Sequence, residues 1–563
     1  MNFPLLLQSV IILATIFAGI PIARSLLPDK DDGMWHIAGI GLSIVYCSLI
    51  VLIGLCIRNF LMQWITLAAA ITWLVLGLLA SKAYRPSQDA SLALILYAAL
   101  ILLASGYQLF MTASARFPYS GAAGYPVDNF IPLWVNEILY YLKHPDSFAL
   151  YPEWRISDRT PLLSFVETFF FHLFRIQPSV SGPDAPQAMG VLRFYFLIGI
   201  FLNGLVIIGA FWFLKTKYGR KAAVIGTALM GLAPFTLINT YYGWPKLFAT
   251  FFFLSALFLI VRNESGFMIG SALGLSYLSH TMYSIFVPGI AVYYYFFMKH
   301  KIGVSRQKAR LSTLIMIASY LIATAPWSVW VNVIYAHPSD KFFRYPFAVY
   351  YHDPNIMSST ALVLRSFFST PLWAIIWIRI VNAVQSIFPV SFGMVPFGFP
   401  DNTRELMLHI LRFYWSSIPG TLLVSTLIPV YYAFGRNFVK DRTFLLTMFI
   451  LPFLIHLGIW GFAANNGMGG EMGRNDAHLF GPLLAGLVAA EALSWSRVYV
   501  RILFLAASLE FIAVSYINFI FSATGLSALR VSFLVGMLSV YCVYLVRRVG
   551  QELSSSDEDP PSA

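Results

Sequence analysis

The stretch GVLRFYFLIGIFLNGLVIIGAFWFLKTKYGRK, residues 190–221, decides the fold of this chain. Residues 190–214 form one apolar run in which Arg193 is the only charged side chain. A run of this length crosses a hydrocarbon layer of about 30 Å as a helix. The stretch therefore predicts a transmembrane helix that ends at the cytoplasm, where the chain carries the basic residues Lys215, Lys217, Arg220 and Lys221.

Similar runs recur along the chain, so a polytopic membrane protein is expected. Of the 563 residues, 58% are hydrophobic and 11% are charged, a composition outside the range of soluble globular proteins. The runs do not alternate with period two, which favours spanning helices over strands. The net charge of +12 lies mainly in short loops and indicates topology rather than nucleic-acid binding. The predicted fold class is all-α, with about 15 transmembrane helices and outer-side loops that contain interfacial helices.

The basic loops predict which side of the membrane each segment faces. Counting crossings from the Lys215 cluster and from the basic loop 299–310 places the N-terminus outside and the C-terminus in the cytoplasm. If the segment 371–391 crossed, Arg436 would lie outside, so this segment is interpreted as interfacial or re-entrant. The predicted organisation is N-terminal transmembrane helices at 1–90, a membrane core at 91–550 with outer loops 112–188, 333–410 and 463–477, and a disordered cytoplasmic tail at 551–563.

The longest predicted outer loop, 112–188, concentrates ionisable residues. Asp128 lies in a segment that contains glycine and proline, a context that can aim a carboxylate at the membrane surface. Such a carboxylate could take a proton from a hydroxyl acceptor, whereas the alternative interpretation is a solvated or turn-forming aspartate. Later in the loop, residues 162–176 place Phe165 and Phe169 on one face, which predicts a helix in the membrane interface.

Three further outer turns carry groups that suit an anionic partner. NTYYGWPK contains Tyr242 and Lys246 at a membrane boundary, and LSHTMY contains His280 at the next outer turn. NNGMGGEMGRNDAH contains Arg474, whose planar donors match phosphate oxygens. The alternatives are that the aromatic residues and the lysine are membrane anchors, and that the glycine-rich turn is a flexible loop.

The order and common sidedness of these elements resemble the GT-C superfamily of integral-membrane glycosyltransferases, which use sugars carried on polyprenyl phosphate. Asp128 corresponds to an acidic residue in the first large outer loop of that family. The element Arg159-Thr160-Pro161-Leu162 is similar to the basic-Pro-Pro-Leu pattern of protein mannosyltransferase and aminoarabinose transferase relatives. The turns GWPK and SHT, and a Glu-x-x-Arg element before Pro482, complete a resemblance that covers about 91–500.

The chain departs from the family pattern at two places. Residues 1–90 precede the core as an addition, and Asn129 stands after Asp128, where the family often has a second acidic residue. No metal ligands are therefore assigned and no cofactor is certain, although the resemblance allows a divalent metal, Mg²⁺ or Mn²⁺.

The resemblance implies transfer of a sugar from a polyprenyl-phosphate carrier to a hydroxyl of a glycan, lipid or protein, with inversion at the anomeric carbon. The predicted location is a multi-pass protein of the cell inner or plasma membrane, with its active site on the extracytoplasmic, periplasmic side and no nucleic-acid partner. Asp128 is the implied base. The implied donor-phosphate contacts are Arg159, Lys246 and Arg474, and the further substrate contacts are Asp158, Tyr242, His280, Glu471 and His478.

Two other functions compete with this interpretation. A flippase or transporter of lipid-linked glycans would need ionisable groups near the bilayer midplane. His456 and Glu510 lie in predicted crossings but are interpreted as hydrogen-bonded structural groups. An enzyme like the O-antigen polymerases or ligases would depend on arginines in a later outer loop, where Arg344 and His352 are candidates.

Overall fold

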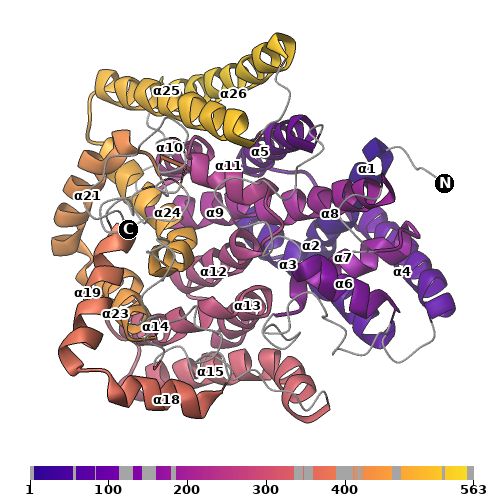
Figure 1. The fold of residues 1–563 in the computed structure, drawn as a ribbon, viewed down its shortest axis with the longest axis horizontal. Coiled ribbons are helices and arrows are strands. Elements are labelled where there is room, and N and C mark those ends of the chain that lie inside the picture. The colour runs from indigo at the N-terminus through magenta and orange to yellow at the C-terminus, as the bar shows by residue number, and fades with distance from the viewer. Residues whose placement is uncertain are drawn as a thin grey trace.

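A computed structural model describes residues 5–54, 59–82, 84–112, 131–141, 160–178, 186–334, 359–387, 422–459, 471–522 and 527–554, with a few single positions between them. Every regular element in these segments is a helix (Figure 1). The chain begins with α1 (Leu5–Phe17), α2 (Gly19–Leu26), α3 (Asp32–Gly54), α4 (Asn59–Ser81), α5 (Gln88–Thr112), α6 (Ile131–Tyr141) and α7 (Leu162–Leu173).

The middle of the chain forms the centre of the bundle, and the C-terminal part covers its flank (Figure 1). The middle elements are α8 (Pro186–Gly204), α9 (Val206–Tyr218), α10 (Arg220–Gly231), α11 (Pro234–Tyr241), α12 (Lys246–Val261), α13 (Gly266–Ser279), the 3-10 helix η4 (Thr281–Phe286), α14 (Val287–His300), α15 (Arg306–Val329) and the π-helix η5 (Trp330–Ile334). The later elements are α18 (Thr360–Ser369), α19 (Leu372–Ile387), η9 (Val424–Thr426), α21 (Leu427–Lys440), α22 (Arg442–Leu445), the π-helix η10 (Leu446–Ile450), α23 (Leu451–Ile459), α24 (Glu471–Ala492), α25 (Arg497–Ser522) and α26 (Ala528–Ser554).

The predicted class, an all-helical polytopic membrane protein, is confirmed, but the described residues contain fewer full-length spans than the predicted number. They include 9 helical segments long and apolar enough to cross a membrane, or up to 11 if each bent pair counts as one span. The expectation of about 15 counted α12 and α13 as crossings. These two apolar helices are shorter than the others, and α12 is buried along almost its whole length at the centre of the bundle.

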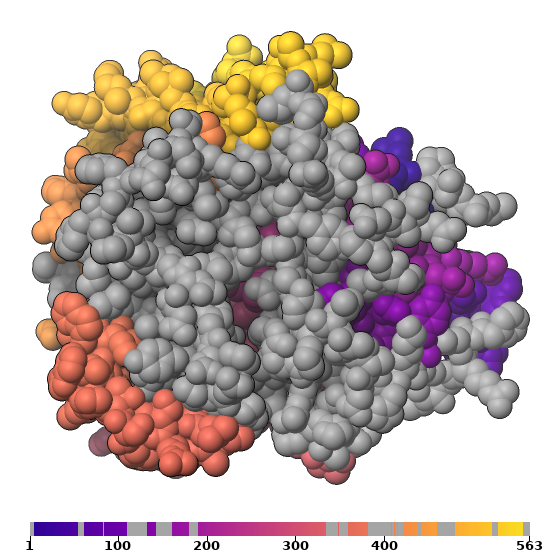
Figure 2. Space-filling model, in the orientation of Figure 1, coloured from indigo at the N-terminus to yellow at the C-terminus, as the bar shows by residue number. Residues whose placement is uncertain are grey.

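Two predicted segments are bent pairs of helices. The run expected to cross at 222–238 breaks between α10 and α11 with a bend of 67°. Pro234 begins α11, and a proline cannot continue the hydrogen bonds of a preceding helix. The segment 371–391 follows a bend of 103° between α18 and α19. Such a bend occurs both in a re-entrant segment and in a broken span, so the re-entrant interpretation stays a prediction. In Figure 2, α18 and α19 form one edge of the visible face, and α25 and α26 form another.

The N-terminal helices pack into the same hydrophobic core as the rest of the chain. One continuous cluster of buried residues runs from Ile12 to Val549. The backbones of α2 and α3 meet closely, because the Gly19 amide donates to Ser43 Oγ at 3.2 Å and a Cβ atom on Gly19 would lie 2.0 Å from the Gly39 carbonyl oxygen. The helices α3 and α4 also contact α7. The division between N-terminal helices at 1–90 and a core that begins at residue 91 stays a prediction.

Ion pairs join several helix ends at one end of the bundle, called here the charged end. The paired residues lie in or beside helix ends that the charge rule assigns to the cytoplasm. Because each pair joins two segments assigned to the same side, the pairs agree with the predicted parity. They are Lys215–Asp89 (2.5 Å), Arg220–Asp89 (3.0 Å), Arg220–Glu552 (3.1 Å), Lys217–Asp441 (2.8 Å), Arg436–Glu491 (2.6 Å), Lys30–Glu264 (2.7 Å) and Arg262–Asp31.

Two predicted segment ends shift. The tail expected from residue 551 starts later, because α26 continues to Ser554 and Glu552 is held by its ion pair with Arg220. The helix α24 begins at Glu471, inside the segment 463–477 that is expected to be a loop. An acidic residue in the first turn favours a helix N-terminus through the helix dipole. Residues 555–563 lie outside the described residues.

Candidate functional site

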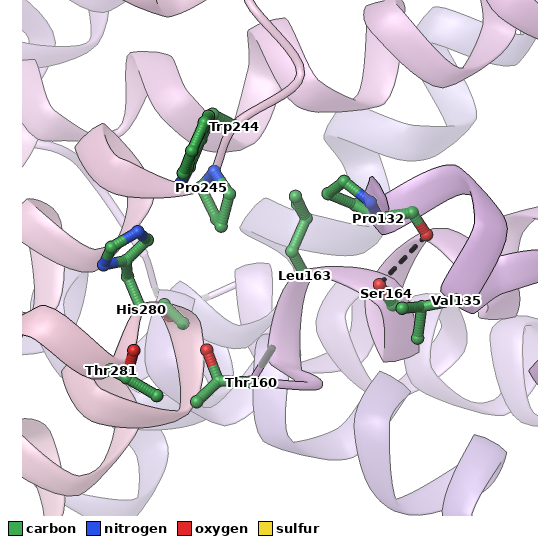
Figure 3. Close-up of a pocket in the computed structure, with 10 residues that line it drawn as sticks. Pro132, Val135, Thr160, Leu163, Ser164, Trp244, Pro245, His280 and Thr281 are labelled. Atoms are coloured by element: carbon green, nitrogen blue, oxygen red, sulfur yellow. Dashed lines mark hydrogen bonds between the residues drawn. The ribbon is translucent and has the colours of Figure 1, made fainter. Parts of the chain in front are cut away.

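A small cavity, called here the aromatic cavity, lies beside the start of α12 (Figure 3). The other end of α12 is followed by Arg262 of the charged end, about 24 Å away along the helix, so the cavity lies at the opposite end of the bundle. It encloses about 20 Å³, which is enough for one water-sized group. The described walls are therefore too close together to surround a sugar ring, and a ligand would contact only their side chains. Its walls come from α6, from the start of α7, from the turn before α12 and from the junction of α13 with η4. The lining residues are Pro132, Val135, Thr160, Leu163, Ser164, Trp244, Pro245, Ser279, His280 and Thr281.

The turn before α12 is held by two buried polar residues of α8. Asn203 donates from Nδ2 to the Tyr242 carbonyl at 3.1 Å, and its Oδ1 accepts from the Phe248 amide at 3.0 Å. Tyr195 donates to the Gly243 carbonyl at 3.0 Å. A Cβ atom on Gly243 would lie 2.4 Å from the Tyr195 hydroxyl, so glycine is required at this close approach. These contacts fix where Trp244 and Lys246 leave the turn.

Lys246 begins α12 beside the aromatic cavity. Its ammonium lies 4.8 Å from the centroid of the Trp244 ring, a cation–π contact, and only 7% of the residue is exposed. Its carbonyl accepts from the Tyr283 hydroxyl at 3.1 Å and from Thr250 Oγ1 at 2.9 Å. The backbone is thus anchored by two hydroxyls, and the burial sets a positive charge in a surrounding where charge interactions are strong.

His280 occupies the junction between α13 and η4. Its Nδ1 accepts from the Met282 amide at 3.3 Å, so a neutral ring carries its proton on Nε2 and can donate from that atom. The ring lies 5.9 Å from that of Trp244, centroid to centroid. Figure 3 shows the hydroxyls of Thr160 and Thr281 below this ring. The wall thus combines an imidazole with several hydroxyls, groups that suit a polar ligand such as a sugar or a phosphate.

The opposite wall is joined by a buried polar network between α6 and α7. Ser164 Oγ donates to the Pro132 carbonyl at 3.2 Å, as Figure 3 shows. Asn136 donates from Nδ2 to Glu167 Oε2 at 2.7 Å, and Thr168 Oγ1 donates to Asn136 Oδ1 at 3.2 Å. Glu167 Oε1 has no hydrogen-bond partner among the described residues. Complete burial raises the pKa of Glu167 well above its usual value, because burial disfavours the charged form of the carboxyl.

The N-terminal helices support α6 and α7 from behind. Gln63 of α4 donates to the Tyr140 hydroxyl at 3.3 Å, and the Tyr140 ring stacks on His172 with centroids 4.2 Å apart. Arg175 lies 5.0 Å from the centroid of the Trp64 ring. Burial lowers the pKa of His172 to about 4, so this ring is neutral at physiological pH. The addition at 1–90 therefore forms the support of one cavity wall.

The helix predicted at 162–176 is present as α7, but it is more enclosed than an interfacial helix. Phe169, Phe170 and Phe171 are all fully buried, although they point in different directions around the helix. The physical reason is that α3, α4, α6 and α13 all contact α7. The first turn of α7 nevertheless lines the aromatic cavity, as expected for a helix beneath an outer site.

The structure brings together three of the predicted sequence elements. His280 of SHT lines the aromatic cavity, as do Trp244 and Pro245 of GWPK, and Lys246 follows directly. Thr160 represents the Arg-Thr-Pro-Leu element. Tyr242 is 5% exposed and is not among the lining residues. Asp128, Asp158 and Arg159 lie outside the described residues, as do Arg344 and His352.

The predicted residues Glu471, Arg474 and His478 lie in the first turns of α24, and their side chains are outside the described part. Their spacing of three and four residues places them on one face of the helix. Phe480 of α24 packs against Phe286 of η4 with ring centroids 6.2 Å apart. Arg474 precedes Phe480 by six residues, about 9 Å along the helix. The helix that carries Arg474 thus reaches the neighbourhood of the element that begins after His280.

Sequence reasoning missed the polar residues that hold the cavity walls. Asn203, Tyr195, Asn136 and Glu167 are buried and hydrogen-bonded there. A signal existed for Asn203, because it is the only amide side chain in the apolar run 190–214, and a polar residue inside a crossing needs a partner.

Glu510 is a structural group, as expected. Its carboxylate accepts from the Val424 amide at 2.5 Å, from the Ser425 amide at 3.0 Å and from the Tyr414 hydroxyl. A carboxylate with these three donors fixes the segment before α21. The His456 side chain is outside the described residues.

The fold and the aromatic cavity define a helical multi-pass membrane protein with a buried lysine, a histidine and hydroxyls gathered at the end of the bundle opposite its ion pairs. Within the described residues, no group of three or more His, Cys, Asp or Glu side chains could hold a metal ion. No protein-family model matches the chain, and no curated protein matches it.

Two solved structures are similar to the chain. One is an oligosaccharyltransferase from Archaeoglobus fulgidus tethered with an acceptor peptide, with 16% identity, a TM-score of 0.38 and coverage of 83% of this chain. The chain spans 56% of the length of that protein. The other is ArnT from Cupriavidus metallidurans bound to undecaprenyl phosphate, with 12% identity, a TM-score of 0.41 and coverage of 82% of this chain and 77% of that one.

Proposed function

We propose that the protein is a membrane glycosyltransferase that transfers a sugar from a polyprenyl-phosphate carrier to a hydroxyl acceptor. The observation that carries the proposal is the convergence of three separate sequence elements on one cavity. Thr160 comes from the Arg-Thr-Pro-Leu element, Trp244 from GWPK and His280 from SHT. Their convergence is what a shared binding site requires, whereas independent membrane anchors need not meet.

The proposed reaction is a displacement at the anomeric carbon with inversion. The acceptor oxygen forms a bond to this carbon, the bond to the phosphate oxygen breaks, and the phosphate leaves with the lipid. Asp128 accepts the proton of the acceptor hydroxyl as general base. Lys246, Arg159 and Arg474 stabilise the charge that develops on the departing phosphate. The hydroxyls of the cavity wall and His280 Nε2 are positioned to bind sugar hydroxyls or phosphate oxygens.

The proposed location of the site is the extracytoplasmic side of the cell inner or plasma membrane. The ion pairs support this sidedness, because they gather the loops assigned to the cytoplasm at the other end of the bundle. The proposed partners are the lipid-linked donor and a glycan, lipid or protein acceptor. Removal of Mg²⁺ and Mn²⁺ by EDTA tests the divalent metal that the resemblance allows.

The test is a transfer assay with the full chain in proteoliposomes, with a radiolabelled sugar on polyprenyl phosphate and a panel of acceptors. Asp128→Asn should lower turnover by about 10²- to 10⁴-fold, because the amide cannot accept the proton. Asp29→Asn, at an exposed carboxylate of the charged end, is the matched control and should leave turnover unchanged. Wild-type turnover in Asp128→Asn would refute the assignment of the base. Movement of the labelled lipid across the membrane without product would favour a transporter.

A further inference from the structure

A second cavity lies at the charged end, among the start of α5, the start of α10 and the end of α26. Its volume is about 440 Å³, much larger than that of the aromatic cavity. One half of its lining is polar and includes Arg220, Arg548, Gln88 and Glu552, whereas the other half includes Leu92, Ile95 and Val224. The division between a polar half that contains arginines and an apolar half is the property that a ligand would have to match.

The two arginines of the polar half differ in their partners. Arg220 is bridged to Asp89 at 3.0 Å and to Glu552 at 3.1 Å. Arg548 contacts the Tyr544 hydroxyl at 3.3 Å and Gln551 Oε1 at 3.4 Å. Among the described residues, no carboxylate lies within ion-pair distance of Arg548. Its guanidinium keeps donors for an anion, and phosphate oxygens match that planar group.

The apolar half continues into an exposed stripe along α5. Ile95 is 41% exposed, Leu102 is 72% exposed and Leu109 is 52% exposed. Residues seven positions apart lie on nearly the same side of a helix, so these three side chains form one line that leads away from the cavity. A lipid chain in contact with this line would run along the membrane-spanning part of α5, with its headgroup at Arg548.

We propose that this cavity binds the phosphate of an anionic membrane lipid, with the headgroup at Arg548 and a hydrocarbon chain along Ile95 and Leu102. A free phosphate ion would use Arg548 but would leave the apolar half without a partner. Basic recesses between helix ends at the cytoplasmic surface suit anionic headgroups. The site is separate from the aromatic cavity, because α12 alone extends about 24 Å from Lys246 to its other end.

The test is native mass spectrometry of the full chain in detergent, titrated with phosphatidylglycerol and, separately, with phosphatidylcholine. Wild type should bind phosphatidylglycerol in preference. Arg548→Gln should weaken this binding about five- to tenfold, because one charge-assisted contact is lost. Arg547→Gln is the matched control, since it removes the same charge from the adjacent exposed residue that does not line the cavity, and it should change binding less than twofold. Melting temperatures of both variants check that they are folded.

Three results would overturn the proposal. Equal binding of phosphatidylcholine would remove the role of the anionic headgroup. Equal losses in Arg548→Gln and Arg547→Gln would assign the effect to net charge rather than to the cavity. The third result has two parts: millimolar inorganic phosphate displaces the lipid, and Ile95→Ser, a change in the apolar half, does not weaken lipid binding. Together they would assign the site to a free anion. The readout is lipid binding, so the outcome does not depend on transfer activity.

Discussion

The ionisable side chains at the charged end and those at the aromatic cavity have different partners. At the charged end, several basic side chains lie in ion pairs with carboxylates, as Lys217 does with Asp441 at 2.8 Å. At the aromatic cavity, the ammonium of Lys246 lies over the Trp244 ring, and none of the described lining residues carries a carboxylate. Nearby, complete burial raises the pKa of Glu167 well above its usual value.

This difference separates charges that hold helices together from charges that can meet a ligand. A cation paired with a carboxylate is already neutralised, and its removal mainly affects stability. A cation beside the proposed ligand site stabilises negative charge on the ligand, so its removal should mainly affect function. The following substitutions test whether the two ends divide in this way.

The largest effect is expected from Lys246→Met. Loss of a positive charge at the proposed phosphate site should lower transfer turnover by about 10²-fold or more, with a small change in melting temperature, whereas Lys246→Arg should keep part of the activity. Lys299→Met, which removes an exposed lysine at the charged end, is the control and should keep full turnover. Equal turnover of the Lys246→Met and Lys299→Met proteins would break the contrast between the ends.

Glu167 should make the stability of the protein depend on pH. The pKa of the carboxyl is raised in the folded state, so its contribution is fully present below the unfolded pKa of about 4.3 and is lost as the pH rises through the folded pKa. Between these two pKa values, the free energy of unfolding of the wild type should fall by about 1.4 kcal/mol per pH unit relative to that of Glu167→Gln. Unfolding of both proteins from pH 5 to 8 measures this slope. If the difference in unfolding free energy between the two proteins stayed constant across this pH range, Glu167 would not bind a proton on folding.

Asp441→Asn should lower stability but not function. Lys217 has 10% of its side chain exposed, so loss of its partner leaves a mostly buried charge, while Asp441 itself is 40% exposed and partly solvated. The expected cost is about 2 kcal/mol, seen as a lower melting temperature, with unchanged turnover per folded molecule. A loss of turnover without a loss of stability would show that the charged end takes part in the reaction.

The smallest effect is expected from Gln63→Leu. This change removes the hydrogen bond from α4 to the Tyr140 hydroxyl behind the cavity wall, at a cost of about 0.5 to 1.5 kcal/mol. A modest rise in KM with unchanged kcat should accompany it, because α6 positions a wall rather than a reacting group. The neighbouring change Trp64→Phe, on the side of α4 that faces Arg175, is the control for general loosening of this helix.

Much of the fold could be predicted because it depends on composition and on charge order. The basic loops predicted which helix ends lie together, and the ion pair of Lys215 with Asp89 joins two of these ends. The elements GWPK and SHT were recognisable because charged and aromatic residues interrupt apolar runs. The short lengths of α12 and α13 reduced the number of full-length spans. For α12 the reason is that a helix enclosed by others can be apolar on all faces without having the usual spanning length.

The rest depended on contacts between distant segments. Asn203 holds the turn at Tyr242 and Phe248, about 40 residues later, and no local pattern predicts that pairing. Likewise, Glu167 meets Asn136 only because α6 and α7 pack side by side. The enclosure of α7 by α3 and α4 could not be inferred either, because hydrophobic periodicity identifies an apolar face but not the element that covers it.

The most direct measurement is the position of the phosphate in a structure of the protein with a non-hydrolysable polyprenyl-phosphate sugar. We predict phosphate density within hydrogen-bond distance of Lys246 or His280, with the sugar against the wall formed by Thr160 and Thr281. Phosphate density only at the charged end, beside Arg220 and Arg548, with the aromatic cavity empty, would contradict it.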